Sequence, residues 1–499
     1  MAQATSWFNV IEATIDDIHN AYKSGQLTAR QLVQIYLERI ETYDKKGPAI
    51  NAIITVNHEA LRDADRLDAA FKASGFVGSL HGIPIVIKDQ ADCKGMPTTM
   101  GSLLFKDYYP DRDAFVVDKL KKAGAIILAK ATLGELGGGD THGSLFGSTR
   151  NPYDLERTAG GSSGGSGASV SANFCTAAIG QEGFASIRRP STWNCIGGMR
   201  PTAGLVSRSG VYAGWPSING SLGPMARTVT DLAKLLDVVA GYDPDDPITA
   251  RGIGRVPGSY TKFLDKNGLK GARLGILRES MGYDSEVGSE DFNKINQVFN
   301  NAVAELKTAG AELIDPIVIA NLNELLAKRA GSYAEEEASF REYLNRSAKP
   351  PYASREEAKN SPDFQKVVKG ARERWNRTAP ATAHYEYLKA RDELMTNMLK
   401  VMADHKLDAI IHKAVEHQPT LIKDGVTPPY VDQKGAPHLN TFLVFVPSIV
   451  VPAGFTLDNL PAGITFLGRP YDDGIMIKFA YAYELATRHR RPPATTTPL

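Results

Sequence analysis

Residues 158–168 read Thr-Ala-Gly-Gly-Ser-Ser-Gly-Gly-Ser-Gly-Ala, and this glycine–serine cluster is the most informative stretch of the 499-residue chain. A flexible linker would continue in Gly and Ser or pass into polar sequence. Here the cluster passes into small helix-forming residues up to Ala172 and then into a strand-like run at residues 176–180. We therefore predict a tight loop that opens a helix, where backbone N–H groups can approach a ligand or an oxyanion.

Taken alone, the cluster is compatible with three kinds of site. A Walker A phosphate loop needs Gly-Lys-Ser/Thr, and no Lys follows these glycines, so that match is weak. Residues 160–164 match the G-x-S-x-G pattern of an α/β-hydrolase nucleophile turn, but so short a pattern is common in Gly/Ser-rich sequence. The third interpretation depends on residues outside the cluster.

Outward from the cluster, helical and strand-like segments alternate along the chain, which indicates α/β layering with the sheet buried on both faces. A capping box predicts a helix that begins after Thr14, and a second helix begins after Thr28. The other predicted helices lie at residues 113–123, 231–240, 292–309 and 475–486. The predicted strands lie at residues 82–89, 125–128, 176–180, 272–277, 311–314, 408–411, 448–451 and 462–467.

We predict an α/β fold in a single large domain over residues 1–499, with a mixed sheet covered by helices on both faces. Residues 1–75 form its N-terminal helical region. Residues from about 320 to 407 are polar, helical in pattern and rich in charge, and we expect a helical insertion or cap there. A solvated helical layer explains the same pattern equally well.

Composition excludes several classes of protein. Lys and Arg number 57 against 56 Asp and Glu, a net charge of +1, and 42% of residues are hydrophobic, so disorder and nucleic-acid binding are not indicated. The chain has no apolar run of about 18–20 residues, and residues 1–11 lack the pattern of a secretory signal. The three scattered cysteines make neither a disulfide framework nor a zinc site. We expect a cytoplasmic protein with no nucleic-acid or membrane partner.

Three separated elements resemble the amidase signature family, the Ser–Ser–Lys amide hydrolases. The first is His-Gly-Ile-Pro-Ile-Val-Ile-Lys-Asp at residues 81–89, with Gly-Met-Pro-Thr-Thr at 95–99. The second is Asn-Pro-Tyr at 151–153 leading into the glycine–serine cluster, and the third runs from Ser-Ile-Arg at 186–188 to Gly-Met-Arg-Pro-Thr at 198–202. Residues 460–470 resemble the closing strand of the family. The resemblance spans nearly the whole chain and is thin between residues 277 and 407.

The resemblance implies an amidase in which Ser186 is the nucleophile, Lys88 the base and Ser162, at a cis peptide bond, the bridge between them. It also implies an oxyanion hole made by backbone N–H groups, those of Gly183, Phe184, Ala185 and Ser186. The substrates are a small-molecule amide and water, and we expect no cofactor and no metal. To act as a base, Lys88 must be neutral, and burial at the end of an apolar strand lowers its pKa from about 10.4. Strand alternation turns the neighbouring Asp89 to the opposite face.

The segment before the predicted nucleophile departs from the family pattern. The family has small residues ending Gly-Gly-Ser, whereas residues 183–186 here read Gly-Phe-Ala-Ser. Ala185 adopts positive φ less readily than Gly, which predicts a differently shaped turn. We hypothesise that Phe184 defines an apolar or aromatic acyl pocket together with a neighbouring loop, which consists of Gly137, Gly138, Gly139 and Asp140. The near-zero net charge of the chain favours a small neutral substrate.

Two other functions remain open. A glutaminase subunit of an A-type amidotransferase belongs to the same superfamily, but such chains carry Gln-Pro-Ala-Ala-Phe-Cys-Gly where residues 189–195 here read Arg-Pro-Ser-Thr-Trp-Asn-Cys. A non-catalytic binding protein on the same fold is the second, and the presence of all three catalytic residues argues against it. The choice among amide, ester and carbamate, and a homodimeric state, are left open.

Overall fold

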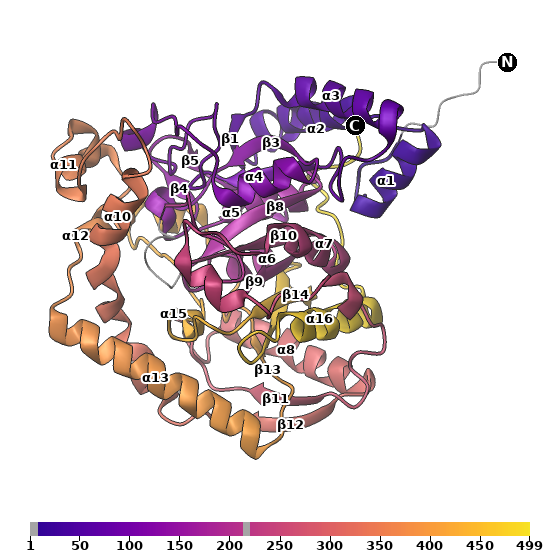
Figure 1. Ribbon diagram of the computed structural model, residues 1–499. Helices are drawn as coiled ribbons and strands as arrows, with labels where there is room; N and C mark the ends of the chain where they lie inside the picture. Colours follow the sequence, from indigo (N-terminus) through magenta and orange to yellow (C-terminus); the bar gives the residue numbers. More distant parts are fainter. Residues whose placement is uncertain (1–7, 213–219) are drawn as a thin grey trace.

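The computed structural model describes residues 8–212 and 220–499, so the first seven residues of the predicted N-terminal helical region lie outside it. Within the described residues an 11-stranded mixed sheet runs through the molecule, from β1 and β3 at the top of Figure 1 to β11 and β12 at the bottom. In order across the sheet, the strands are β1 (Ile53–Val56), β3 (Ile126–Ala131), β2 (Pro84–Lys88), β8 (Ala177–Glu182), β10 (Ser221–Ala226), β9 (Gly197–Arg200), β14 (Ser448–Phe455), β15 (Pro461–Leu467), β13 (Ala409–Lys413), β11 (Arg273–Leu277) and β12 (Glu312–Ile317).

The sheet combines parallel and antiparallel pairs. Strand β2 is parallel to both neighbours, β3 and β8, and β11 is parallel to β12 and β13. The pairs between β8 and β15, including β8 with β10 and β14 with β15, are antiparallel. Pro84 starts β2, where the missing N–H does not interrupt the ladder. Two small hairpins flank the main sheet, formed by β4 (His142–Gly143) with β5 (Gly147–Ser148) and by β6 (Arg150–Asn151) with β7 (Asp154–Thr158).

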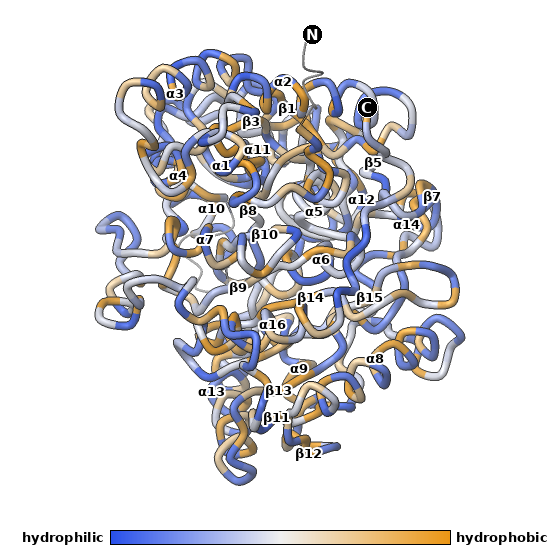
Figure 2. Tube along the Cα trace, turned by 90° about the vertical axis from the view of Figure 1, so that its right-hand side faces the viewer, coloured by the Kyte–Doolittle hydropathy of each residue, from blue (hydrophilic) through white to orange (hydrophobic). Residues whose placement is uncertain are grey.

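Helices cover the sheet on both faces, as the sequence predicts. Figure 2 shows hydrophilic and hydrophobic residues alternating along outer helices such as α3 and α8, the pattern of helices that bury one side. The helices around the sheet are α1 (Ile15–Ser24), α2 (Ala29–Arg39), α3 (Ala60–Ser74), α4 (Phe115–Lys122), α5 (Gly164–Ser171), α6 (Arg188–Trp193), α7 (Val229–Val239), α8 (Glu290–Thr308), α14 (Ile422–Val426), α15 (Leu439–Phe442) and α16 (Asp473–Thr487). Helix α1 begins with the predicted capping box of Thr14 and Asp17.

Between β12 and β13 the chain forms the predicted helical insertion, which we call the cap (residues 320–407). It contains α9 (Leu322–Leu326), the 3₁₀ segment η6 (Ala327–Glu335), α10 (Glu336–Leu344), α11 (Arg355–Lys359), α12 (Lys369–Asn376) and α13 (Ala381–Asp404). Figure 1 shows the cap as an outer layer along one side of the molecule, with α13 at its lower edge. Its own aromatic core, which includes Phe340 and Trp375, packs against Phe105 near the sheet domain.

The glycine–serine cluster forms the loop between β7 and α5, as predicted. Its glycines are needed because other backbone segments approach them closely. A Cβ at Gly161 would collide with the carbonyl oxygen of Gly139, and one at Gly164 would collide with the Thr141 side chain. The loop therefore brings residues 137–141 directly against the start of α5. No helix among the described residues is both long and apolar enough to cross a bilayer.

Candidate active site

Lys88 is the last residue of β2 and is buried in the middle of the sheet, with 1% of its surface exposed. Its Nζ lies 2.7 Å from Ser162 Oγ and 3.2 Å from the Gln181 carbonyl oxygen. Burial lowers the pKa of Lys88 well below its ordinary value, and the negative charge of Glu182 opposes this shift only in part. The side chain is therefore suited to hold a neutral amine next to a serine hydroxyl.

Asp89 does not interfere with this lysine. Its carboxylate accepts from Thr99 N at 3.1 Å and forms an ion pair with Lys130 at 2.9 Å, both partners lying away from Ser162. The alternation predicted along the strand thus separates the two adjacent charged residues, and Lys88 has a hydroxyl partner instead of a carboxylate.

Ser162 lies where the glycine–serine loop turns toward α5, and the Gly161–Ser162 peptide bond is cis. Its hydroxyl, besides its contact with Lys88, donates to the Gly137 carbonyl at 2.9 Å, and its own carbonyl accepts from Gly134 N at 3.0 Å. The next residue, Ser163, anchors the loop to β8, because its hydroxyl donates to the Gln181 carbonyl at 3.2 Å. These bonds fix Ser162 between the end of β2 and the 137–140 loop.

Ser186 follows β8 and lies beside the same loop, since its carbonyl accepts from Ser163 N at 3.1 Å. No hydrogen bond joins the side chains of Ser186 and Ser162 in this structure. Within the part of the chain that the structure describes, the backbone N–H groups of residues 183–186 donate no hydrogen bond, so they are available to a ligand. The segment carries no left-handed residue, and Ala185 adopts an ordinary negative φ, so the strain expected at that position is absent.

A buried ion pair supports the segment that carries Ser186. Glu182 accepts from Arg188 Nε at 2.8 Å, from the backbone N–H groups of Ile187 and Arg188 at 2.8 and 2.9 Å, and from Asn440 Nδ2 at 2.9 Å. Burial alone would raise the pKa of Glu182, but the charges of Arg188 and Arg200 outweigh it and hold the pKa below its usual value. The sequence analysis did not identify Glu182, because only the folded chain shows its four donors.

Glu182→Gln is expected to lower the free energy of unfolding by about 3–5 kcal/mol, because it leaves Arg188 buried without its anion. Urea denaturation at neutral pH measures this difference. The folded pKa of Glu182 is depressed, so its contribution is present above its unfolded pKa of about 4.3 and is lost as the pH falls through the folded pKa. The gap between wild type and variant should therefore narrow in acid. The control is Glu337→Gln, an exposed partner of Arg341 worth about 0–1 kcal/mol. A change equal to that of the control would contradict the structural role.

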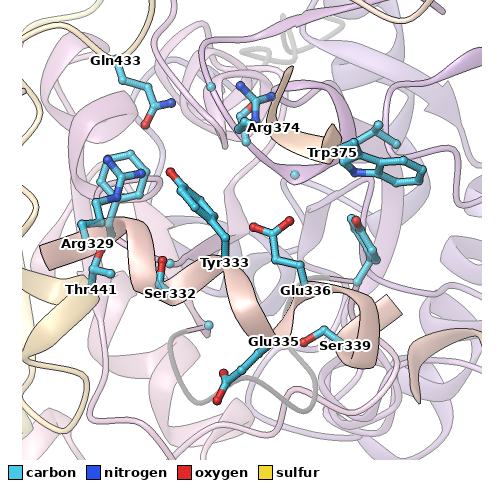
Figure 3. Close-up of a pocket in the computed structure, with 18 residues that line it drawn as sticks. Arg329, Ser332, Tyr333, Glu335, Glu336, Ser339, Arg374, Trp375, Gln433 and Thr441 are labelled. Atoms are coloured by element: carbon cyan, nitrogen blue, oxygen red, sulfur yellow. The ribbon is translucent and has the colours of Figure 1, made fainter. Parts of the chain in front are cut away.

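A pocket of about 180 Å³ joins the two segments that the sequence analysis placed together, since Gly137, Gly138, Gly139, Gly183 and Phe184 all line it. Asp140 has a different role in the structure: its buried carboxylate pairs with Arg189 at 2.6 Å, and the residue lines a neighbouring cavity of about 750 Å³. Cap residues complete the pocket, and Figure 3 shows them around it: Arg329, Ser332, Tyr333, Glu335, Glu336, Ser339, Arg374 and Trp375. The sequence offered no local signal for them.

The Phe184 ring is held from two sides. The Arg329 guanidinium lies 4.0 Å from its centroid, and the His438 ring meets it edge-on at 4.7 Å. Phe184 is thus a wall of the pocket that also ties the Ser186 segment to the cap. The pocket it lines contains charged side chains besides aromatic ones, so its surface is more polar than the hypothesis of an apolar acyl pocket describes.

Comparison with known proteins gives a consistent result. The family model described as Amidase matches residues 31–476. A probable amidase of Arabidopsis thaliana is 32% identical over 98% of this chain and 93% of its own, and a glutamyl-tRNA(Gln) amidotransferase subunit of the A type, from Thermoanaerobacter pseudethanolicus, is 32% identical over 96% and 97%. Among solved structures, the peptide amidase of Stenotrophomonas maltophilia superposes with a TM-score of 0.85 at 32% identity, covering 97% of this chain and 99% of that one.

Proposed function

The chain belongs to the amidase family and is a hydrolase of amide C–N bonds, and from that premise we propose that Ser186, Ser162 and Lys88 carry the reaction. The observation that supports this proposal most directly is the contact of 2.7 Å between Lys88 Nζ and Ser162 Oγ, two buried side chains beside the Ser186 segment. A buried lysine that contacts a hydroxyl instead of a carboxylate is an unusual arrangement, and general-base chemistry gives it a purpose.

Acylation begins with neutral Lys88. Its N–H donates to the Gln181 carbonyl, which leaves the nitrogen lone pair for the Ser162 hydroxyl proton. Ser162 in turn takes the proton of Ser186 as Ser186 Oγ attacks the amide carbon. The developing oxyanion accepts hydrogen bonds from the backbone N–H groups of residues 183–186. The C–N bond then breaks, and the proton held by Lys88 returns through Ser162 to the departing nitrogen.

Deacylation uses the same groups in the reverse direction. Water attacks the acyl-Ser186 ester, and its proton passes through Ser162 to Lys88. The oxyanion collapses, the ester C–O bond breaks and Ser186 Oγ regains a proton from the same relay. One lysine thus serves as base and acid in both halves, which requires a pKa near the working pH and explains why a buried position suits it.

The substrate is a carboxamide, and esters or carbamates fit the same acyl-enzyme chemistry. Glutaminase activity within an amidotransferase complex is the second candidate, because a relative named as part of such a complex is as similar to this chain as the amidases are. A single chain or a homodimer would act alone, whereas an amidotransferase component requires its complex. Glutaminase assay of the purified chain, combined with its size in solution, distinguishes the two.

The proposal is tested by covalent labelling with a fluorophosphonate. Ser186 Oγ attacks phosphorus, the P–F bond breaks, fluoride leaves and the proton goes to Lys88 through Ser162. We expect a stoichiometric mass increase that tandem mass spectrometry assigns to the Ser186 peptide, together with loss of amide hydrolysis. Labelling of another serine, or labelling that persists in Ser186→Ala, would show that the nucleophile is wrongly assigned.

A further inference from the structure

Arg329 is a cation of the pocket wall that has no carboxylate partner among the residues described. It extends from η6 of the cap, stacks on Phe184 and places Nη1 3.0–3.1 Å from the ring nitrogens of His438. Burial and the adjacent Arg329 charge lower the pKa of His438 well below its usual value, so this ring is neutral and supplies no negative charge. Burial also lowers the pKa of Arg329 itself, which measures the cost of keeping its charge there.

The acidic groups around the pocket are already engaged by other residues. Asp432 pairs with Arg374 at 3.4 Å, Glu336 with Arg355 at 3.0 Å, and Glu335 lies 3.7 Å from His384. No ion pair of Arg329 exists within residues 8–212 and 220–499, and residues 213–219, beyond the description, contain no Asp or Glu. The positive charge beside Phe184 is therefore not neutralised by the protein.

Two buried polar atoms in the same wall also have no partner among the described residues. They are Thr441 Oγ1 and Gln433 Oε1, on side chains that are 5% and 9% exposed. Both residues line the pocket, and Figure 3 shows them on the side where Arg329 lies, whereas Glu336 stands toward Trp375. An apolar group bound here would leave the guanidinium and both polar atoms without partners, which costs binding energy.

We propose that Arg329 and Thr441 form a subsite for a carboxylate carried by the acyl part of the amide substrate. Two donors, one of them charged, converge on a region bordered by the segment that precedes Ser186, and a carboxylate can accept from both. This inference rests on the proposed function and names its substrate class. It departs from the neutral substrate expected from the net charge of the chain, because a single pocket cation determines the local field.

The test compares two chromogenic substrates of equal acyl length, glutaryl-4-nitroanilide and pentanoyl-4-nitroanilide, which differ by a carboxylate in place of the terminal methyl group. We expect wild-type kcat/KM to be about 10- to 100-fold higher for the glutaryl compound, the range of one charge-assisted hydrogen bond. Arg329→Met should bring this ratio to about 1, and Arg329→Lys should restore part of it. Lys328→Met removes an exposed charge from the adjacent position and should leave the ratio unchanged.

The ratio is the decisive quantity, because Arg329 also stacks on Phe184 and its loss can slow both substrates. Thr441→Val keeps the shape of the wall and should lower the ratio by about 3- to 10-fold, so it serves if Arg329→Met does not fold. A wild-type ratio near 1, or a ratio unchanged in Arg329→Met or in Thr441→Val, would overturn the carboxylate subsite. Failure of wild type to hydrolyse either compound, with no fluorophosphonate label on Ser186, would instead refute the proposed catalytic assignment.

Discussion

Ser186→Ala is expected to reduce kcat for amide hydrolysis by about 10⁶-fold, the loss found when the nucleophile of a serine hydrolase is removed. Without Oγ no acyl-enzyme forms, and Lys88 and Ser162 have no proton to relay. The substitution removes one side-chain atom and keeps the backbone bond from Ser163 N to the Ser186 carbonyl, so the free energy of unfolding should change by less than about 1 kcal/mol. Steady-state assay and thermal denaturation of the same preparation measure both quantities.

Ser191 provides a matched control for this variant. It lies five residues further on, in α6, and its buried hydroxyl has no hydrogen-bond partner in the described structure. Ser191→Ala therefore removes the same atom from the same region, and we expect its kcat to stay within about 3-fold of wild type. More than about 1% residual activity in Ser186→Ala, after exclusion of contaminating enzyme, would contradict the nucleophile assignment.

The sequence predicted those features of this molecule that depend on local pattern. Lys88 at the end of an apolar strand and Ser162 in the glycine–serine loop each lie in a recognisable motif, and the structure brings their side chains into contact. The alternation of helices and strands predicted the α/β layers, since burial of one or two faces leaves a period in the sequence. The order and direction of the strands could not be read in this way, because pairing such as β8 with β10 joins segments about 40 residues apart.

The pocket lining was the main feature that the sequence did not reveal. Arg329 and Glu336 lie in a polar helical stretch whose pattern fits a solvated surface, and only the return of the cap over the sheet places them beside Phe184. Phe184 was noticed as a departure from the family pattern and was assigned to an apolar pocket. Its ring instead lies under a guanidinium, a contact that no local pattern reports. Residues that act through distant contacts are thus the ones for which structure is required.

Lys88→Met is expected to reduce kcat by about 10⁴-fold, the upper range for loss of a general base, because Ser162 then has no acceptor for the proton of Ser186. In wild type the deprotonated amine is the active form, so kcat/KM should fall about tenfold per pH unit below the lowered pKa of Lys88 and be constant above it. The residual activity of Lys88→Met should lack this limb of the pH profile. A variant that kept the wild-type profile would show that another group titrates.

Stability distinguishes this role from a structural one. Lys88 makes no ion pair within the part of the chain described, and the Gln181 carbonyl keeps its bond from Ser163 Oγ, so replacing the amine with the apolar Met side chain removes a desolvation cost and should leave the free energy of unfolding unchanged or raised. Lys130 is the opposite case, because it neutralises buried Asp89 at 2.9 Å, and Lys130→Met should destabilise the protein by about 3–5 kcal/mol. Since the two lysines end neighbouring strands of one sheet, unequal stability with equal loss of charge would separate a lysine kept for chemistry from one kept for the fold. Equal destabilisation of both variants would assign Lys88 to the fold as well.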